Sequence, residues 1–466
     1  TSHSGLLDRS TQYLCRGQGQ IMPQPAEKAA DGHAQESTFN YGWVVALAGF
    51  MMHLCLGTMY CWGSLTPYIT SYLRIYDPSV TYSDTIIVFM LTPAAMAISM
   101  PLGGIIEKRL GGRTTALLGS WIMCSGELLS VFATTTFQLV ITHCFIFGFG
   151  MGVAYMNPIA CGYRWLPKRK GLVSGIVVAG FGLGGAFFNL VGAMICNPNQ
   201  EQPDPYFEAD VANRVPTMFA TLGGMYFLMT TVGALLIRDP TPEDLRRLYG
   251  DRDEEENKAI LQPQQRAATK EIDVCGFLAD YRSYVLWLMM ALTTAAGYLV
   301  IGTYKTYGHQ QGFSDSTLTF IGSICLIFNG GGRLTYGYLC DVLGFKLVMM
   351  ICFLLQAFVV YFVTSTTFSA MLFAAFICVT VANYGAAFTF YPTACAELFG
   401  TKNVSANYGV VFSGFAAQGI LLKLALSSPS IDYDTIVMLT AMGAGLSSLG
   451  VLLLDGGKIL KDYKQM

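Results

Sequence analysis

Two related stretches decide the fold, Gly104-Ile-Ile-Glu-Lys-Arg-Leu-Gly-Gly-Arg113 and Gly337-Tyr-Leu-Cys-Asp-Val-Leu-Gly-Phe-Lys346. The same spacing of 233 residues, half of the 466-residue chain, separates Gly104 from Gly337 and Arg113 from Lys346. Self-similarity at a fixed period indicates an internal repeat, and membrane transporters are commonly built from such repeats. The chain is therefore expected to consist of two halves of one design.

The composition around these stretches indicates a membrane protein. The chain is 53% hydrophobic and 12% charged, with a mean hydropathy of +0.46, whereas soluble domains carry about 25% charged residues. A net charge of −2 argues against a nucleic-acid partner. The 13 cysteines lack the paired spacing of a zinc site or disulfide framework, so no metal is expected.

Apolar runs long enough to cross a bilayer, about 20 residues each, occur twelve times. They lie near 43–65, 83–106, 114–134, 136–160, 172–196, 216–237, 284–306, 317–340, 346–364, 369–393, 404–426 and 434–454. The stretch 238–282 holds eight Lys/Arg and eleven Asp/Glu and must lie in water. The fold class is thus an all-α membrane protein with twelve transmembrane helices.

The positions of these runs predict five parts of the chain. They are an N-terminal tail (1–40), a six-helix bundle (41–237), a central loop (238–282), a second six-helix bundle (283–455) and a C-terminal tail (456–466).

Positive charges in the short loops predict the orientation of the chain. Residues 107–113 and 164–170 are rich in Lys and Arg, whereas residues 197–215 carry four acids against Arg214 alone. By the positive-inside rule, both termini and the central loop are expected to be cytoplasmic. Residues 1–40 lack the apolar core of a signal peptide, and a plasma membrane is favoured over an organelle membrane.

The repeated stretch resembles the loop motif of the major facilitator superfamily, G-x-L-x-D-R-x-G-R-R. The resemblance implies a major facilitator fold of two six-helix bundles, and a gate in which the acid of the motif caps a neighbouring helix. The second copy matches it well. The first has Lys108 at the acidic position and Glu107 one residue earlier. The gating residues expected from both copies are Gly104, Arg109, Gly111, Arg113, Gly337, Asp341, Gly344 and Lys346.

Further motifs resemble the oxalate:formate antiporter branch, which is related to the monocarboxylate transporters. The resemblance runs over nearly the whole membrane region and implies a small organic anion as cargo. The motifs are Gly57-Thr-Met-Tyr-Cys-Trp62, Gly148-Phe-Gly-Met-Gly-Val-Ala-Tyr-Met-Asn-Pro158, Trp165-Leu-Pro-Lys-Arg-Lys-Gly171, Gly180-Phe-Gly-Leu-Gly184, Asn329-Gly-Gly-Gly-Arg333 and Phe399-Gly-Thr-Lys-Asn-Val-Ser-Ala-Asn-Tyr-Gly409.

Arg333 is the leading candidate for binding that anion. It lies about two-thirds along its expected span, and ionisable residues inside a bilayer are costly enough to indicate function. A guanidinium offers a planar fork that fits a carboxylate, and the family resemblance places a substrate-binding arginine here. The alternative is a structural pair with Asp341 or with a backbone carbonyl.

A second cation decides between mono- and dicarboxylates. Resemblance to the oxalate carriers implies a lysine after the Asn-Tyr-Gly motif, but the corresponding residue is Phe415. A dianion held by one cation would leave a carboxylate desolvated and unpaired, so a monocarboxylate is expected. Snorkelling to the headgroups is the favoured explanation of Lys305, but if its side chain turns inward it supplies a second cation.

Aromatic residues at positions that match the family's cavity complete the expected binding site, although such rings also serve lipid contact and packing. They are Tyr60, Tyr155, Phe181, Tyr384, Phe388 and Phe412. His53 matches a further lining position and is also a candidate for proton coupling. Glu127 is the main carboxylate candidate for a proton site, against a packing role.

These features predict a secondary active transporter of lactate-, pyruvate- or formate-like acids. It would work by alternating access, as anion exchange or proton symport, so a proton or counter-anion is a possible partner and no cofactor is expected. One alternative is a dicarboxylate or a larger acid such as pantothenate. Another is a transport-inactive subunit of an assembly. An enzyme is not expected, because no phosphate loop or nucleophile–base constellation occurs, and the sequence does not fix the oligomeric state.

Overall fold

The computed structural model describes residues 39–201, 203–249, 271–426, 428 and 430–454. The chain separates into residues 1–39 and residues 40–466, and the described helices belong to the second unit. Residues 1–38 of the expected N-terminal tail, the whole expected C-terminal tail 456–466 and residues 250–270 of the central loop lie outside the described residues, so the five-part division of the chain stays a prediction.

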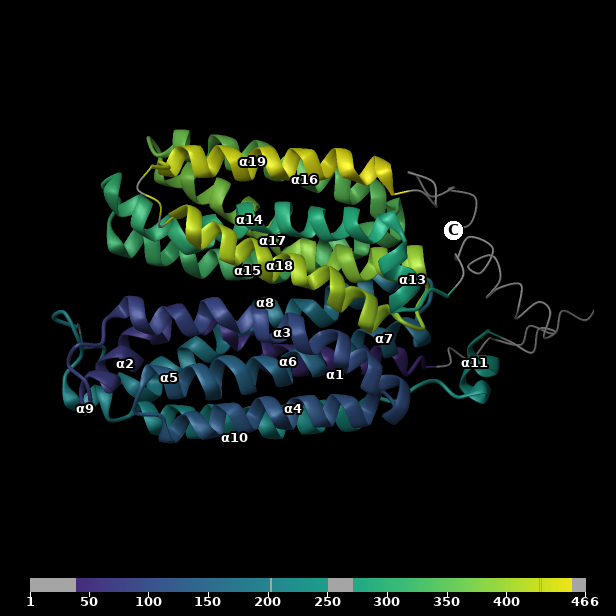
Figure 1. Ribbon diagram of the computed structural model, residues 1–466, viewed down its shortest axis with the longest axis horizontal. Coiled ribbons are helices and arrows are strands. Elements are labelled where there is room, and N and C mark those ends of the chain that lie inside the picture. Colours follow the sequence, from purple (N-terminus) through teal and green to yellow (C-terminus); the bar gives the residue numbers. More distant parts are fainter. Residues whose placement is uncertain (1–38, 202, 250–270, 427, 429, 455–466) are drawn as a thin grey trace, which may run out of the picture. The chain divides into compact units, whose positions relative to one another are not determined.

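The first half of the second unit contains six helical segments long and apolar enough to span a membrane, and Figure 1 shows their arrangement. Their helices are α1 (Gly42–Leu56), η1 (Gly57–Cys61), α2 (Trp62–Arg74), α3 (Tyr82–Leu110), α4 (Gly112–Leu129), η2 (Ser130–Phe132), α5 (Thr136–Leu139), η3 (Val140–Phe147), α6 (Gly148–Tyr155), α7 (Asn157–Trp165), α8 (Lys170–Cys196), α9 (Ala209–Ala212) and α10 (Val215–Leu236).

The second half repeats this plan, and the described part of the central segment contributes the short helices α11 and α13. Its elements are α11 (Pro242–Tyr249), α13 (Val274–Ala279), α14 (Tyr281–Gln310), α15 (Asp315–Leu343), α16 (Phe345–Phe362), η4 (Val363–Thr366), α17 (Ala370–Phe399), α18 (Val404–Leu426), α19 (Tyr433–Gly450) and η5 (Val451–Leu453). Among the described residues, eleven helical segments are long and apolar enough to span a membrane. The 29-residue helix α15 takes the place of the remaining expected span and carries Asn329 and Arg333 in its middle. The all-helical, twelve-span fold class is confirmed.

The repeated stretches form the same structure in both halves. Gly111 ends α3 with a φ of +80°, and Gly344 ends α15 with a φ of +92°. Only glycine adopts this left-handed backbone without strain, so both copies turn sharply into the next helix. We call the end of the bundles that carries Gly111 and Gly344 the motif end.

Two expected spans are not regular α-helices. The first is interrupted by the 3₁₀ segment η1, between α1 and α2. The fourth contains the π-helical segment η3, which widens the helix around His143. Such irregular turns are frequently found at functional sites, and hydropathy alone predicts neither.

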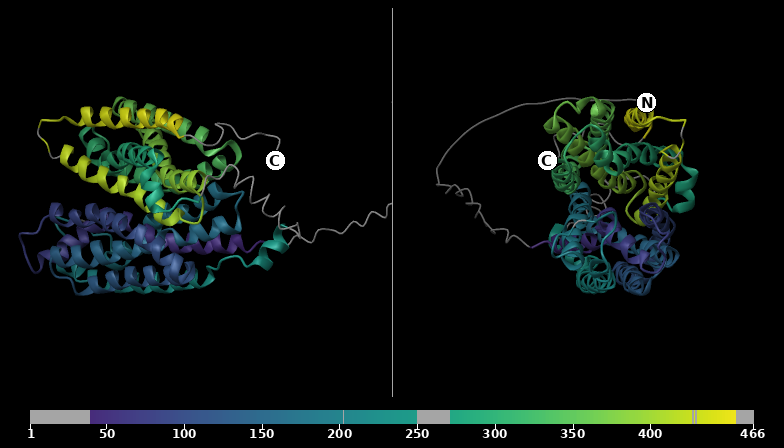
Figure 2. Two further views of the ribbon diagram at one scale, coloured as in Figure 1. Left: turned by 45° about the vertical axis from the view of Figure 1, so that its right-hand side comes forward. Right: turned by 90° about the vertical axis from the view of Figure 1, so that its left-hand side faces the viewer.

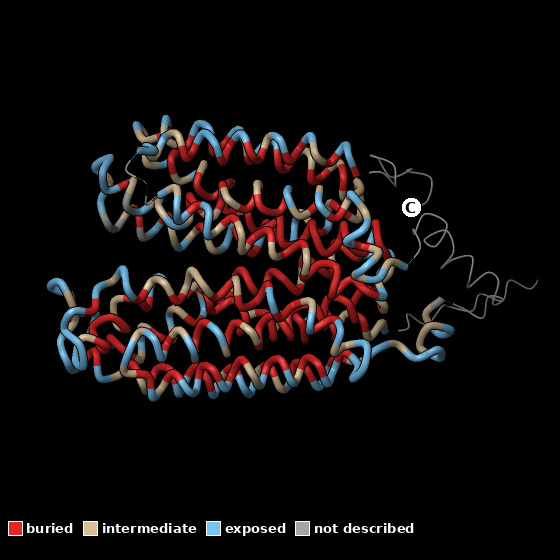
Figure 3. The backbone as a smooth tube through the Cα atoms, viewed as in Figure 1, coloured by how far each residue is buried: buried red, intermediate tan, exposed pale blue. Residues whose placement is uncertain are grey.

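The two bundles lie side by side, as the end-on view of Figure 2 shows. α8 packs against α15 and α3 packs against α18, so each half contributes helices to the contact. In Figure 3, buried residues line the facing helices of both bundles toward the motif end. Small residues permit this approach: a Cβ placed on Gly171 would lie 2.3 Å from the carbonyl oxygen of Gly337.

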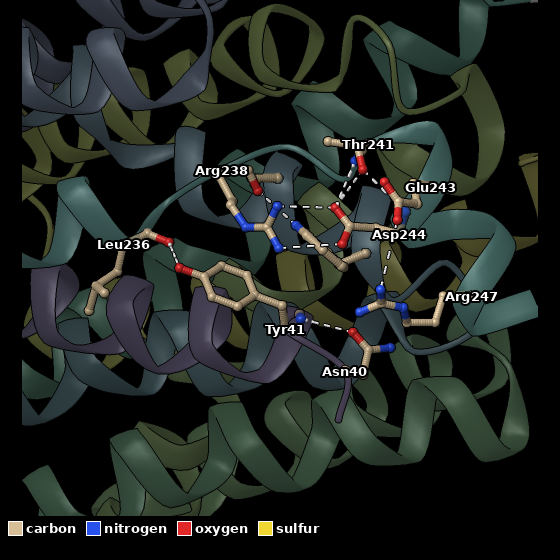
Figure 4. A network of polar contacts seen from close by, with 11 residues as sticks. Asn40, Tyr41, Leu236, Arg238, Thr241, Glu243, Asp244 and Arg247 are labelled. Carbon is tan, nitrogen blue, oxygen red and sulfur yellow. Dashed lines mark hydrogen bonds and ion pairs between the residues drawn. The ribbon is translucent and has the colours of Figure 1, made fainter. Parts of the chain in front are cut away.

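Polar contacts tie the chain that leaves α10 to the start of α1 (Figure 4). The Tyr41 hydroxyl donates to the carbonyl oxygen of Leu236 at 3.0 Å, and the Arg238 guanidinium lies 4.4 Å from the Tyr41 ring centre. Arg238 also pairs with Asp244 at 3.0 Å. The Thr241 N–H and hydroxyl, together with Arg238, hold the pKa of Asp244 below its usual value, so this carboxylate stays charged near neutral pH.

Candidate functional site

Arg333 lies at the centre of the site, on α15 where this helix meets α8. Its side chain is fully buried. Nε donates to Asn329 Oδ1 at 2.9 Å, and Nη1 donates to the carbonyl oxygen of Val178 on α8 at 3.2 Å. Nη2 has no hydrogen-bond partner. Arg333 therefore does not pair with Asp341. A backbone carbonyl does accept a hydrogen bond from Nη1, but Nη2 is left available for a ligand.

Aromatic rings from both bundles surround this guanidinium. Its carbon lies 5.6 Å from the Phe181 ring centre and 5.0 Å from that of Phe388. Every aromatic residue expected at the site belongs to one connected cluster of rings. The centre-to-centre distances are 5.6 Å for Tyr60–Phe181, 5.5 Å for Tyr155–Phe181, 6.1 Å for Tyr155–Phe412, 6.2 Å for Phe388–Phe412, 5.2 Å for Tyr384–Phe388 and 5.2 Å for Phe388–Phe415.

Three more polar atoms inside the ring cluster form no well-aligned hydrogen bond, namely Nε2 of His53 and the hydroxyls of Tyr155 and Tyr408. The two hydroxyls interact with each other. His53 is fully buried, with Nδ1 3.1 Å from the Gly49 carbonyl oxygen and its ring 4.7 Å from that of Tyr155. Buried polar groups normally form well-aligned hydrogen bonds, so atoms without one, grouped near a cation, favour a ligand-binding role.

A cavity of about 170 Å³ approaches the site from the end opposite the motif end. Tyr60 and Tyr384 belong to its lining, and their hydroxyls are 3.3 Å apart. These two tyrosines also border the ring cluster, so they separate the cavity from Arg333. The lining includes Lys423, whereas Lys305 lies exposed near the end of α14. The inward-facing role for Lys305 stays a prediction.

The motif end is closed by acids that cross between the bundles. Asp341 accepts hydrogen bonds from the backbone N–H groups of Gly171 at 2.8 Å and Leu172 at 2.7 Å, which places its charge at the N-terminus of α8. In the first copy, Glu107 pairs with Arg164 at 3.0 Å and accepts from Ser405 at the start of α18 at 2.6 Å. Glu107 thus occupies the equivalent place despite its shift by one residue.

The other residues of the repeated motif contact backbone or solvent. Arg113 donates to the Ile237 carbonyl oxygen at 2.8 Å, Lys346 donates to that of Leu454, and Arg109 is exposed. A Cβ on Gly104 would lie 2.5 Å from the backbone nitrogen of Ala406 in the opposite bundle.

A second hollow, about 660 Å³, lies at the motif end and is lined by Lys108, Lys402 and Glu271 among others. None of its lining residues belongs to the ring cluster around Arg333. We therefore assign the candidate site to the smaller cavity and the guanidinium behind it.

Glu127 lies apart from the ring cluster, inside the first bundle. It is 2% exposed, and its Oε2 is 2.9 Å from Nδ1 of His143. Glu127 was named from the sequence as a candidate proton site, whereas His143 was not. The sequence does not show that α4 and η3 bring these two side chains together. Asn329 and Tyr408 were likewise missed as site residues, although both stand inside motifs that the sequence analysis quoted.

Two helical bundles that enclose a buried cation and approach each other through glycines define a membrane transporter rather than an enzyme. The sequence pattern of the Major Facilitator Superfamily matches residues 45–422. The chain belongs to this family.

Relatives whose names specify a cargo are similar along most of the chain. Apicoplast pyruvate carrier 1 of Toxoplasma gondii is 26% identical in an alignment that covers 89% of this chain and 88% of the carrier's length. The oxalate:formate antiporter of Oxalobacter formigenes is 23% identical, covering 86% and 88%. Monocarboxylate transporter 12 of Rattus norvegicus is 23% identical, covering 82% and 78%. The resemblance drawn from the motifs is confirmed.

A solved structure supports the fold. The proton:xylose symporter XylE, bound to 6-bromo-6-deoxy-D-glucose, superimposes with a TM-score of 0.65 at 13% identity. The match covers 88% of this chain and 95% of that one.

Proposed function

We propose that this protein carries small monocarboxylates across the membrane by alternating access. The observation that carries the proposal is the unpartnered Nη2 of Arg333, buried among aromatic rings from both bundles. A carboxylate bound there gains a charge-assisted hydrogen bond in a dry environment, while its apolar end meets the rings. The names of three relatives, which specify pyruvate, oxalate with formate, and monocarboxylates, support this class of cargo.

The charge of the site favours one carboxylate over two. Phe415 is 2% exposed and packs 5.2 Å from Phe388 and 5.4 Å from Phe412. It therefore fills the second-cation position with an apolar ring. A second carboxylate beside it would be desolvated without a partner, which disfavours oxalate.

Polar atoms near the guanidinium favour an acid with oxygen on its second carbon. The hydroxyls of Tyr155 and Tyr408 interact with each other but form no well-aligned hydrogen bond, and Nε2 of His53 has no hydrogen-bond partner. All three residues lie close enough to Arg333 to interact with it electrostatically. These groups could bind the keto oxygen of pyruvate or the hydroxyl of lactate, whereas formate offers no such atom.

The orientation of the chain belongs to the proposal. Lys108, Arg109 and Arg169 lie exposed at the motif end, and the positive-inside rule then places this end in the cytoplasm. The cavity beside Tyr60 would accordingly face the opposite side of the membrane.

Counterflow in proteoliposomes tests the function directly. Vesicles containing the purified protein and preloaded with unlabelled pyruvate are expected to take up labelled pyruvate and lactate. Uptake of formate, oxalate and pantothenate is expected to be weaker. Vesicles that exchange none of these acids would refute the proposal and favour a transport-inactive subunit, while preferred exchange of oxalate would refute the monocarboxylate assignment.

Replacing Phe415 by lysine is expected to shift preference toward dianions. One added charge-assisted hydrogen bond is worth about 1.5–3 kcal/mol, which corresponds to roughly a 10- to 100-fold gain for oxalate relative to pyruvate. The ratio of oxalate to pyruvate counterflow measures this effect. Phe415→Leu is the matched control, since it removes the ring without adding charge, and an equal shift in both variants would contradict the electrostatic explanation.

A further inference from the structure

Few Asp, Glu, Lys, Arg or His side chains are buried in the described part of the chain. Two of them, Lys170 and Lys346, lie near the motif end, where Lys170 pairs with Glu397 at 3.1 Å and Lys346 with the Leu454 carbonyl oxygen. The remaining buried groups lie within the spans and are Arg333, His53, Glu127 and His143. Arg333 has no carboxylate among its partners, so its charge is not balanced at the binding site.

Among the described residues, Glu127 is the carboxylate that lies buried within the spans, so its pair with His143 is where negative charge can balance Arg333. Glu127 comes from α4, and His143 comes from the π-helical segment η3. Their closest atoms are 2.9 Å apart, and both residues are less than 8% exposed. The His143 ring packs 4.4 Å from Trp62 and 4.5 Å from Phe147, measured between ring centres.

Titratable groups from the neighbouring elements also face this pair. They are Cys61 of η1, Cys124 of α4 and Tyr226 of α10, each of which interacts electrostatically with Glu127, together with Cys144 beside His143 on η3. Thiols and phenols are neutral in their usual form at physiological pH. The charge of the pair is therefore set by the protons held on Glu127 and His143.

We infer that Glu127 and His143 form a proton-binding site whose charge balances that of Arg333 during transport. This inference rests on the proposed function, and it assigns a coupling ion and a residue pair to it. When the pair holds one proton it is neutral overall, and when it releases that proton to water it carries one negative charge. Release breaks the O–H or N–H bond that holds the proton and forms an O–H bond on water, and rebinding reverses this; between these two steps the proton crosses the membrane with the substrate.

The need for charge balance in the membrane interior then couples the movement of the substrate to that of the proton. With substrate bound and the pair protonated, Arg333 is neutralised by the carboxylate and the interior has no net charge. When the substrate and the proton have both been released, the negative charge of the deprotonated pair balances the positive charge of Arg333. Each half-loaded state leaves one uncompensated charge in a low-dielectric interior, which is costly. The neutral states change orientation most readily, so one proton moves with each monocarboxylate.

The first span connects the two sites physically. Tyr60 borders the Arg333 ring cluster, through its contact with Phe181, and Trp62 packs on His143 two residues later. Between them the 3₁₀ segment η1 ends and α2 begins. A change in backbone at this break moves both contacts together.

His53 fits the role less well. It lies against Tyr155 and Phe181 in the same cluster as Arg333, and protonation there would place two positive charges near each other. Like charges disfavour ionisation, so His53 is assigned to the substrate site and not to coupling.

Glu127→Gln separates exchange from net transport. The glutamine removes the carboxylate, so the pair can no longer become negative, and the substrate-loaded carrier with a neutral His143 can still cross in both directions. The empty carrier then retains the uncompensated Arg333 charge and returns slowly. We expect pyruvate counterflow within about 3-fold of wild type, and a loss of 10-fold or more in pyruvate accumulation driven by a pH gradient, where 10-fold corresponds to about 1.4 kcal/mol in a barrier.

A second variant tests the imidazole through a readout other than rate. His143→Gln retains the carboxylate but removes its partner, so proton-driven uptake is expected to continue with an altered pH profile. Equal accumulation by wild type and Glu127→Gln would overturn the inference while leaving the proposed function intact. Loss of counterflow together with accumulation in Glu127→Gln would also overturn it, by assigning Glu127 a structural role. Absence of counterflow in the wild type would instead refute the proposed function.

Discussion

Arg333→Ala is expected to abolish carboxylate transport. The substitution removes the buried cation of the ring cluster, whose Nη2 lacks a protein partner. A substrate carboxylate would then enter a desolvated aromatic site without a positive charge. Leaving a buried charged group unpaired costs about 3 kcal/mol or more, so affinity should fall by roughly 100-fold or more. Counterflow of labelled pyruvate, and stabilisation of the protein by pyruvate in a thermal unfolding assay, measure the loss.

Arg333→Lys is the matched control. Lysine keeps the charge but loses the planar fork that reaches Asn329 and Val178, as well as stacking against Phe388. Partial activity is expected, well above that of Arg333→Ala. Because ligand binding raises the melting temperature only when the ligand binds the folded state, a folded Arg333→Ala protein should show no pyruvate-dependent shift. Undiminished uptake by this variant would exclude Arg333 as the anion site.

Much of the fold follows from local sequence features. Each apolar run becomes a helix because a bilayer requires internal satisfaction of backbone hydrogen bonds. The helix ends at Gly111 and Gly344 follow from a backbone conformation that favours glycine. Helix bounds were less accurate: α17 extends to Phe399 through Pro392, beyond the expected end at residue 393. Neighbouring helices can satisfy the backbone hydrogen-bonding groups that a proline leaves unpaired, so the helix continues past Pro392. Hydropathy does not reveal where such a helix ends.

The candidate site was predicted in part. Arg333 stood out because charge within an apolar span is costly, and the family resemblance supplied the aromatic positions. Pairings between distant segments could not be read from the sequence, because they depend on how helices rotate and cross. Glu107 illustrates this limit. Its register differs from that of Asp341 by one residue, yet its longer side chain reaches Ser405 of the opposite bundle. The role of His143 beside Glu127 was hidden for the same reason.

Alanine at Gly337 is expected to stop transport by preventing closure of the motif end. An added Cβ would lie 2.4 Å from the Gly171 carbonyl oxygen and 3.0 Å from the Gly175 Cα, both backbone atoms of α8. Backbone cannot rotate away as a side chain can, so α8 and α15 must separate. That separation also strains the hydrogen bonds from Gly171 and Leu172 to Asp341. With the motif end held open, turnover should fall by about 10-fold or more, a barrier increase of at least roughly 1.4 kcal/mol.

Gly331→Ala is the matched control on the same helix. Outside the neighbouring backbone of α15, no atom lies within 4 Å of the added Cβ, and alanine has a higher helix propensity than glycine. Its transport should equal that of the wild type. The position of the gate is measured by alkylation of Cys340, which is 3% exposed and has its Cβ 2.9 Å from the Cβ position of Gly171. Mass spectrometry of the labelled peptide should show faster modification in Gly337→Ala than in Gly331→Ala. Equal labelling with normal turnover would mean that this glycine contact does not govern closure, since a shut motif end has no room for a methyl group between α8 and α15.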